Sequence, residues 1–207
     1  MREPSAAAAL ALPSTAIVLA SSSPRRSQLL AQLGISFSVV APDIDETPYL
    51  DERPDRYVRR LAVAKAWAIP IDPSVANDRA TLMIAADTTV DVDGQVFGKP
   101  VDAIEAEVML GLLSGRTHQV HTGVAVRMGD QVLSDVSTSD VTFATLSSAD
   151  IAWYIATNEP FDKAGAYAIQ GAGGVFVEHI SGSVSGIIGL PLDITVALAR
   201  QLGVELR

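Results

Sequence analysis

The fold is decided by residues 16–34, AIVLASSSPRRSQLLAQLG. The first five residues of this stretch form a short, continuous apolar run, which is typical of a buried strand. Ser23 is suited to the N-cap of a helix, Pro24 to its first turn and Gly34 to its end. A strand, a turn and a helix therefore follow one another directly, which indicates an α/β protein.

The rest of the chain continues this alternation and adds a hairpin. Apolar runs predict further strands, and periodic stretches that begin at capping residues predict further helices. The predicted strands cover 37–41, 82–86, 120–127, 132–143 and 175–180, and the predicted helices begin at Pro54, Asp102 and Ser147 or cover 190–202. Gly129 and Asp130 lie between two of these strands, which predicts antiparallel pairing there. We therefore expect an α/β fold on a mixed sheet with flanking helices.

Composition limits the classes of protein that fit. The chain has 207 residues, of which 48% are hydrophobic and 19% charged, enough for one domain with a full core. Its formal net charge of −9 argues against a protein that coats nucleic acid, because such binding relies on Lys and Arg. The absence of cysteine excludes disulfides, thiolate metal sites and a cysteine nucleophile.

The N-terminal residues 1–15, MREPSAAAALALPST, admit two interpretations. A basic residue before a short apolar run resembles a secretory leader, but Pro13 ends the run early and Glu3 opposes the positive start. We therefore expect a flexible N-terminal extension over 1–15 and a single domain over 16–207. No window reaches the roughly 18 apolar residues of a membrane span, so we expect no membrane partner and a cytoplasmic location.

The segment 21–26, SSSPRR, has the composition of an anion-binding turn. Backbone N–H groups at a helix N-terminus favour phosphate, hydroxyl groups add hydrogen bonds, and arginine can hold two phosphate oxygens at once. Ordinary capping explains Ser23 and Pro24. It does not explain Arg25 and Arg26, because cations in the first turn oppose the helix dipole. The segment therefore indicates a phosphate site.

Three other patterns do not support a ligand site. Residues 111–117 lack the glycine spacing and the lysine of a P-loop, which leaves a helix C-terminus. Residues 171–174 lack the third glycine of a dinucleotide fingerprint, which leaves a flexible turn. His118 and His121 are three residues apart on a predicted strand, so they point to opposite faces, and we do not expect a shared metal.

Two carboxylates are better placed. Asp87 directly follows the apolar run 82–86, so we expect it at a strand end, where open α/β sheets bind ligands. An aspartate there is also a common cap of a turn or helix, and both interpretations stay open on local grounds. Glu46 belongs to an acidic loop that is solvated by default, and alone it decides nothing.

Taken together, these segments resemble the Maf family of nucleoside triphosphate pyrophosphatases. The resemblance covers the chain except the N-terminal extension and the last few residues, with several motifs in the family's order. They are SSSPRRSQLLAQLG (21–34), IDE (44–46), AVAKA (62–66), AADTTV (85–90), GKP (98–100), SGRTHQVHTGVAV (114–126), EPFDKAGAYAIQG (159–171) and IIGLPLD (187–193). The resemblance implies an elongated, two-lobed Maf/ITPase-like fold with a central cleft.

The resemblance also implies a reaction and a cofactor. Members of the family cleave the bond between the α and β phosphates of a nucleoside triphosphate, releasing the monophosphate and pyrophosphate, and they require a divalent cation. Mg²⁺ or Mn²⁺ would take carboxylate and phosphate oxygens, in keeping with a chain that has no cysteine. The resemblance further allows a homodimer, although no apolar stripe in the sequence indicates a partner.

Residue roles follow from the matched motifs. Asp87 falls at the position of the catalytic base, and Glu46 and Asp87 would hold the metal. The phosphate-contacting positions are Ser21, Arg25, Arg26, Lys65 and Lys99. The chain has only three lysines, and we expect all of them, with Lys163 as the third, to point into one cleft beside the two arginines.

The family divides by base preference. Thr88 after the aspartate, and the segment 162–171 with Gln170, resemble the branch that acts on dTTP and UTP. By the same resemblance Arg25, Thr88 and Gln170 are specificity positions, and the amide of Gln170 suits the edge of a pyrimidine. Relatives often carry an aromatic residue near position 184, where this chain has GSVSG. Two alternatives stay open: an enzyme for modified nucleotides, and a nucleotide-binding regulator of septum formation.

Overall fold

A computed structural model describes residues 15–70 and 80–207 of the chain. The expected extension over 1–15 lies outside this part except for its last residue. The elements, in chain order, are β1 (Ala16–Ala20), α1 (Pro24–Ala31), β2 (Ser38–Val40), α2 (Pro54–Ala68), β3 (Thr81–Val92), β4 (Gln95–Phe97), α3 (Ala103–Leu113), β5 (Thr117–Met128), β6 (Gln131–Phe143), α4 (Ser148–Ala156), η1 (Glu159–Asp162), η2 (Ala164–Ala166), η3 (Ala172–Phe176), β7 (Val177–Ser181), α5 (Val184–Ile188) and α6 (Leu192–Gln201).

One mixed sheet organises the molecule. Its strand order is β2-β1-β3-β5-β6-β7, and β4 pairs with β3. β1 pairs in parallel with β2 and β3, whereas β3, β5, β6 and β7 pair antiparallel in succession. The predicted hairpin is present, with Gly129 and Asp130 between the paired residues Met128 and Gln131. The expected mixed α/β class is therefore confirmed.

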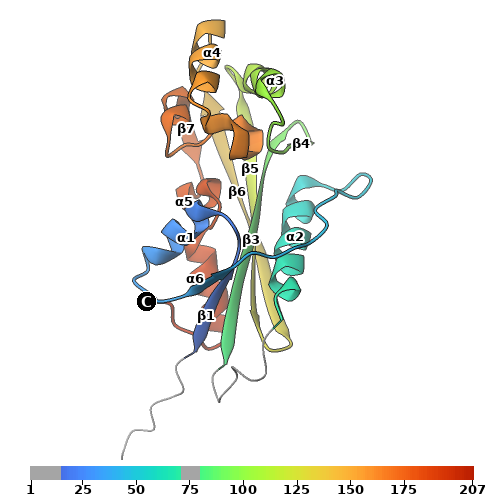
Figure 1. The fold of residues 1–207 in the computed structure, drawn as a ribbon, viewed down its shortest axis with the longest axis vertical. Coiled ribbons are helices and arrows are strands. Elements are labelled where there is room, and N and C mark those ends of the chain that lie inside the picture. The colour runs from blue at the N-terminus through green and yellow to red at the C-terminus, as the bar shows by residue number, and fades with distance from the viewer. Residues whose placement is uncertain (1–14, 71–79) are drawn as a thin grey trace, which may run out of the picture.

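The molecule is elongated, and its core is divided along its length (Figure 1). In the lower half, α1 and α6 pack on one face of the sheet, around residues such as Leu82 and Val124. α2 covers the other face, around Met83 and Ala125. A separate apolar cluster in the upper half packs α3 and α4 against the far end of β3. β3 and β5 run through both halves, so the two lobes share their central strands.

Of three local predictions, two are wrong. The strand predicted over 82–86 is β3, which has 12 residues, so Asp87 lies within a strand, opposite Gly123, rather than at its end. The helix predicted over 190–202 is confirmed as α6, with Pro191 at its N-cap, and the separate short helix α5 before it was not predicted. The turn predicted over 171–174 belongs largely to the 3₁₀ helix η3.

The helices of the described segments are short. The longest is α2, with 15 residues. Within 15–70 and 80–207, no helix is both long enough and apolar enough to cross a membrane.

Candidate active site

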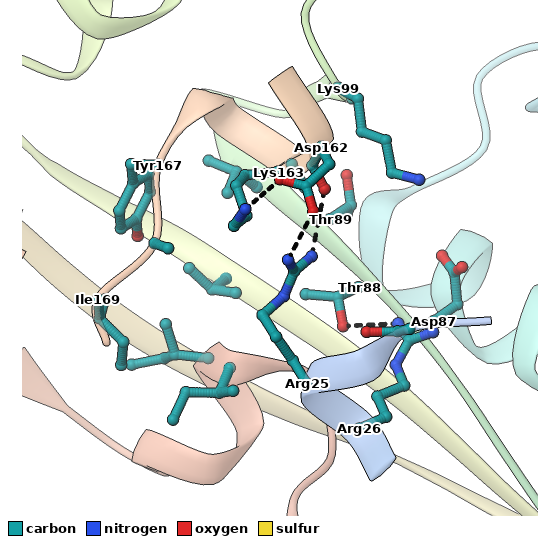
Figure 2. A pocket seen from close by; sticks show the side chains of 18 of the residues that line it. Arg25, Arg26, Asp87, Thr88, Thr89, Lys99, Asp162, Lys163, Tyr167 and Ile169 are labelled. Carbon is teal, nitrogen blue, oxygen red and sulfur yellow. Dashed lines mark hydrogen bonds and ion pairs between the residues drawn. The ribbon is translucent and has the colours of Figure 1, made fainter. Parts of the chain in front are cut away.

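A cavity of about 470 Å³ opens beside the middle of β3, between the two lobes (Figure 2). Its walls come from the start of α1, the loop before α2, α2 itself, the β4–α3 loop, the η1–η2 segment and α5. All the predicted site residues except Ser21 line it, namely Arg25, Arg26, Glu46, Lys65, Asp87, Thr88, Lys99, Lys163 and Gln170. The structure thus brings the three lysines together beside the two arginines.

Ser21 lies beneath the cavity and supports Arg26. The side chain of Ser21 is buried, and its Oγ accepts hydrogen bonds from the N–H of Ser23 and from Nη1 of Arg26, at 3.1 and 3.2 Å. Nε of Arg26 donates to the carbonyl of Gly189 at 2.8 Å, and Nη2 donates to Oγ1 of Thr88 at 3.2 Å. These bonds hold the Arg26 guanidinium in one orientation at the cavity wall.

Thr88 is the middle of a directed chain of hydrogen bonds. The hydroxyl of Thr122 donates to the carbonyl of Gly186 at 2.8 Å. The hydroxyl of Thr88, 2.9 Å from that of Thr122, therefore donates to it and accepts from Arg26. These hydrogen bonds fix the rotamer of Thr88 and connect α5 to Arg26.

Two carboxylates meet at one ammonium group. Nζ of Lys65 lies 2.6 Å from Oδ1 of Asp87 and 2.7 Å from Oε1 of Glu46. Asp87 and Lys65 are buried, whereas about half of the Glu46 side chain is exposed. Burial raises the pKa of Asp87 above its ordinary value, although Lys65 and Arg26 oppose this shift. Asp87 is therefore a stronger base than a carboxylate in water.

The position of Lys65 follows from the sequence of α2. Val58, Leu61 and Ala62 form the buried face of the helix, and Lys65 continues that spacing by one turn. The lysine stem therefore packs against the sheet while its ammonium reaches β3. The periodicity of α2 therefore accounts for the position of the Lys65 ammonium beside the sheet.

Tyr57 was missed by sequence reasoning, and it positions the acidic loop. It lines the cavity, and its hydroxyl donates to the backbone carbonyl of Glu46 at 2.9 Å. Burial, with the charges of Asp87 and Glu46, raises the pKa of Tyr57 to about 12, so the hydroxyl stays protonated. No motif indicated this residue, because the contact joins a helix to an irregular loop.

Arg25 reaches across the cavity to Asp162 and Lys163 on its upper side, and Asp162 is another residue that sequence reasoning missed (Figure 2). Nη1 of Arg25 lies 2.9 Å from Oδ2 of Asp162, and Lys163 contacts the other carboxylate oxygen. Asp162 stands in the quoted motif EPFDKAGAYAIQG, so the signal was present, but it suggested only the neighbouring lysine.

Apolar side chains form another part of the wall, among them Ile169, which directly precedes Gln170 in the chain. They are Val90, Val120, Tyr167, Ile169, Ile187 and Ile188. An amide beside an apolar surface is suited to a flat heterocycle, which offers both a polar edge and apolar faces. α5 contributes to this wall, while Val184 at its start is about half exposed.

The two histidines of β5 belong to separate environments. Nε2 of His118 lies 2.8 Å from the hydroxyl of Tyr167, and burial lowers the pKa of His118 to about 4. His121 lies 3.2 Å from Asp91. The two rings occupy opposite faces of the strand, as their spacing predicts. Over the part of the chain that the structure describes, no group of three or more Asp, Glu, His or Cys is arranged to hold a metal.

Fold and site together define an α/β protein with a cleft in which lysines and arginines surround a pair of carboxylates. The chain belongs to the Maf family, because the family described as Maf-like protein matches residues 16–202. It is 50% identical over 192 residues to the dTTP/UTP pyrophosphatase of Myxococcus xanthus, covering 93% of this chain and 95% of that protein. The dTTP/UTP pyrophosphatase of Chromobacterium violaceum is also 50% identical to this chain, and the match covers 93% of this chain and 97% of that protein.

Among solved structures, the Staphylococcus aureus Ham1 protein matches this chain with 16% sequence identity and a TM-score of 0.42. The match covers 63% of this chain and 72% of the Ham1 chain.

Proposed function

We propose that this chain is a nucleoside triphosphate pyrophosphatase that hydrolyses the α–β phosphoanhydride of dTTP and UTP to the monophosphate and pyrophosphate. Relatives at half identity over nearly the whole chain carry the name dTTP/UTP pyrophosphatase, and this chain is a hydrolase of the same class, acting on acid anhydrides. The observation that carries the proposal is the buried Asp87, held by Lys65 in a cleft lined with cations.

The cations suit the phosphate chain. A nucleoside triphosphate carries about four negative charges near neutral pH, and phosphoryl transfer needs them held and neutralised. Arg25, Arg26, Lys65, Lys99 and Lys163 all line the cavity. Arginine can bind two phosphate oxygens at once, and lysine acts as a point charge. Together they would hold the chain of phosphates while the α phosphorus is attacked.

Asp87 is the proposed general base. Its raised pKa brings the carboxylate nearer to the operating pH, which strengthens it as a proton acceptor. Lys65 engages Oδ1, so we assign acceptance of the water proton to Oδ2. The water then attacks the α phosphorus, and the bond to the bridging oxygen breaks to release pyrophosphate. The hydrogen bonds of Arg26 keep its guanidinium in place as charge develops.

Glu46 and Asp87 are suited to hold a divalent cation. Both carboxylates already lie within 2.7 Å of one positively charged group, the Lys65 ammonium, so both can face a single cation. Mg²⁺ is commonly held by one or two carboxylates with substrate phosphates completing its coordination. A bound metal would neutralise phosphate charge and polarise the reacting phosphoryl group.

Base selection is proposed for Arg25, Thr88 and Gln170. The Gln170 amide offers a donor and an acceptor, which a pyrimidine edge can match, and the neighbouring apolar wall can cover the ring. Thr88 is held in one rotamer by Arg26 and Thr122, so it presents a fixed surface. A fixed polar group discriminates between bases more sharply than a mobile one.

The test is a substrate panel with analysis of the released phosphate species. We expect dTTP and UTP, with Mg²⁺ or Mn²⁺, to yield the monophosphate and pyrophosphate faster than purine or modified pyrimidine triphosphates. Asp87→Asn should abolish turnover with the fold intact, whereas Asp93→Asn, in the exposed turn after β3, should leave it unchanged. Release of orthophosphate would contradict the assigned bond, and a preference for modified bases would contradict the assigned substrates.

A further inference from the structure

The cleft carries an internal carboxylate at its cations. Asp162, at the end of η1, faces Arg25 of α1 across the cavity (Figure 2). Nη1 of Arg25 donates to Oδ2 at 2.9 Å, and Nη2 donates to the backbone carbonyl of Asp162 at 3.2 Å. Lys163 contacts the remaining carboxylate oxygen, Oδ1. Each oxygen of one carboxylate is thus bound to one cation.

The two arginines differ in this respect. Arg26 donates to a carbonyl and two hydroxyl groups, all of them neutral, so its charge stays available to an anion. Arg25 directs both terminal nitrogens at Asp162. Lys163 donates to the carbonyl of Glu159 at 3.2 Å besides contacting Asp162. A carboxylate of the chain itself therefore partly neutralises Arg25 and Lys163.

The Asp162 side chain is also the most exposed of the three. It is 63% exposed, compared with 23% for Arg25 and 14% for Lys163. Burial opposes its ionisation, but the hydrogen bonds from Lys163 and Arg25 outweigh burial and lower the pKa of Asp162, so it is ionised at neutral pH. An exposed ion pair is worth little, about 1 kcal/mol or less, and a more highly charged ligand can displace it.

We propose that Asp162 is an internal competitor of the phosphate chain: its carboxylate occupies Arg25 and Lys163 in the free protein, and a phosphate must displace it to reach them. This proposal rests on the proposed function of the cleft. The contact lowers the apparent affinity for a phosphate ligand by the fraction of molecules in which the cations are free. When the product dissociates, the carboxylate returns and competes against rebinding.

The experiment measures binding of inorganic pyrophosphate by calorimetry. Asp162→Asn keeps the size of the side chain and removes its charge, so we expect pyrophosphate to bind about fivefold more tightly, the size expected for an exposed ion pair. Asp162→Ser should show the same gain. Asp93→Asn breaks an exposed ion pair with Arg116, outside the residues that line the cavity, and should leave affinity unchanged.

A double-mutant cycle separates direct competition from a general effect of charge. In an Arg25→Gln background the gain from Asp162→Asn should largely disappear, because the contested guanidinium is gone. An equal gain in both backgrounds would overturn the proposal, since it would reflect only the lost negative charge. An unchanged or weaker affinity in Asp162→Asn would also overturn it and would make Asp162 a residue that positions Arg25.

Pyrophosphate binding needs no turnover. If the wild-type protein released no pyrophosphate from any nucleotide, the proposed function would fail while the competition could still be measured. If turnover is normal and the affinity gain is absent, the competitor role alone fails.

Discussion

At the scale of single residues, Gly123 sets how closely α2 approaches the sheet. It stands on β5 opposite Asp87, and a Cβ built there would lie 2.3 Å from the backbone carbonyl oxygen of Val58 in α2. Backbone atoms cannot yield as a flexible side chain can. Any side chain at 123 would therefore push away the helix that carries Lys65 and Tyr57.

Gly123→Ala should lower the free energy of unfolding by about 1–3 kcal/mol, the usual range for overpacking. It should also reduce turnover, because Lys65 would be displaced from Asp87. Urea denaturation followed by circular dichroism measures the first effect. Gly111→Ala is the matched control: a Cβ there meets no described atom within 4 Å, and alanine in a helix interior should add about 0.5–1 kcal/mol. Equal stability of the two variants would contradict this account of Gly123.

The pair of Glu52 and Arg60 holds the acidic loop. Arg60 donates to both carboxylate oxygens of Glu52 at 2.7 and 2.6 Å and to the carbonyl of Thr47 at 3.2 Å. Its guanidinium also lies 4.0 Å from the centre of the Tyr49 ring. Through these contacts α2 restrains the loop that carries Glu46.

Glu52 should make stability depend on pH in a defined window. Its hydrogen bonds with Arg60 lower the folded-state pKa below the ordinary value of 4.5, although burial opposes the shift. The stabilisation is therefore present above pH 4.5 and is lost as pH falls through the lower, folded-state pKa. Wild type should be more stable than Glu52→Gln near pH 7, and the difference should shrink below pH 4.5 in urea titrations. Arg60→Gln removes the same pair and should behave alike, while a difference independent of pH would refute the assignment.

At the scale of elements, α1 and α3 both follow a residue of N-cap type, Ser23 and Asp102, but the two caps differ in structure. Asp102 caps α3 by accepting a hydrogen bond from the N–H of Glu105 at 2.8 Å. Ser23 occupies the N-cap of α1, but its side chain makes no cap bond within the described segments. Around α1, the backbone of Ser23 instead donates to Ser21, which supports Arg26.

Asp102→Ala should therefore cost about 1 kcal/mol of stability, as the loss of a capping bond usually does. Ser23→Ala removes no capping bond and should change the urea midpoint much less. Thermal or urea unfolding of both variants decides this point. A larger loss for Ser23→Ala would show that the α1 turn depends on its hydroxyl after all.

Capping residues, turn residues and apolar runs in the sequence predicted the elements whose formation depends on neighbouring residues. The strand–turn–helix order at α1, the hairpin at Gly129 and the helix start at Ser147 appear as expected, although the Ser23 side chain makes no cap bond within the described segments. β3 was predicted too short, because its apolar run ends at Ala86 and three polar residues, Asp87, Thr88 and Thr89, follow. The roles of Tyr57 and Asp162 could not be predicted, since each depends on a contact between segments that only the folded chain brings together.

At the scale of the whole molecule, the net charge of −9 and the cationic cleft are compatible. Fields between exposed charges are largely screened beyond roughly 8–10 Å at physiological salt. A small triphosphate inside the cavity therefore experiences the five nearby cations, whereas a long polyanion along the surface meets the acidic excess. The positions of the cations in the cavity, and not the net charge of the chain, therefore decide which anion binds.

The shared strands predict that the two lobes unfold together, as the single domain proposed for 16–207 requires. β3 contributes Met83 to the lower core and Val90 to the upper core, and β5 contributes Val124 and Val120 in the same way. Neither lobe can lose its core without breaking strands that the other lobe needs. Unfolding should therefore be one cooperative transition.

The two tryptophans provide a probe in each lobe. Trp67 of α2 stacks under Arg127, whose guanidinium carbon is 3.9 Å from the ring centre, and Trp153 of α4 lies 6.3 Å from Phe176. Trp153→Phe leaves the lower probe, and Trp67→Phe leaves the upper one. In each variant the urea midpoint from fluorescence should coincide with that from circular dichroism. An earlier fluorescence midpoint in Trp67→Phe alone would show that the upper lobe unfolds separately, and would divide the chain into two domains.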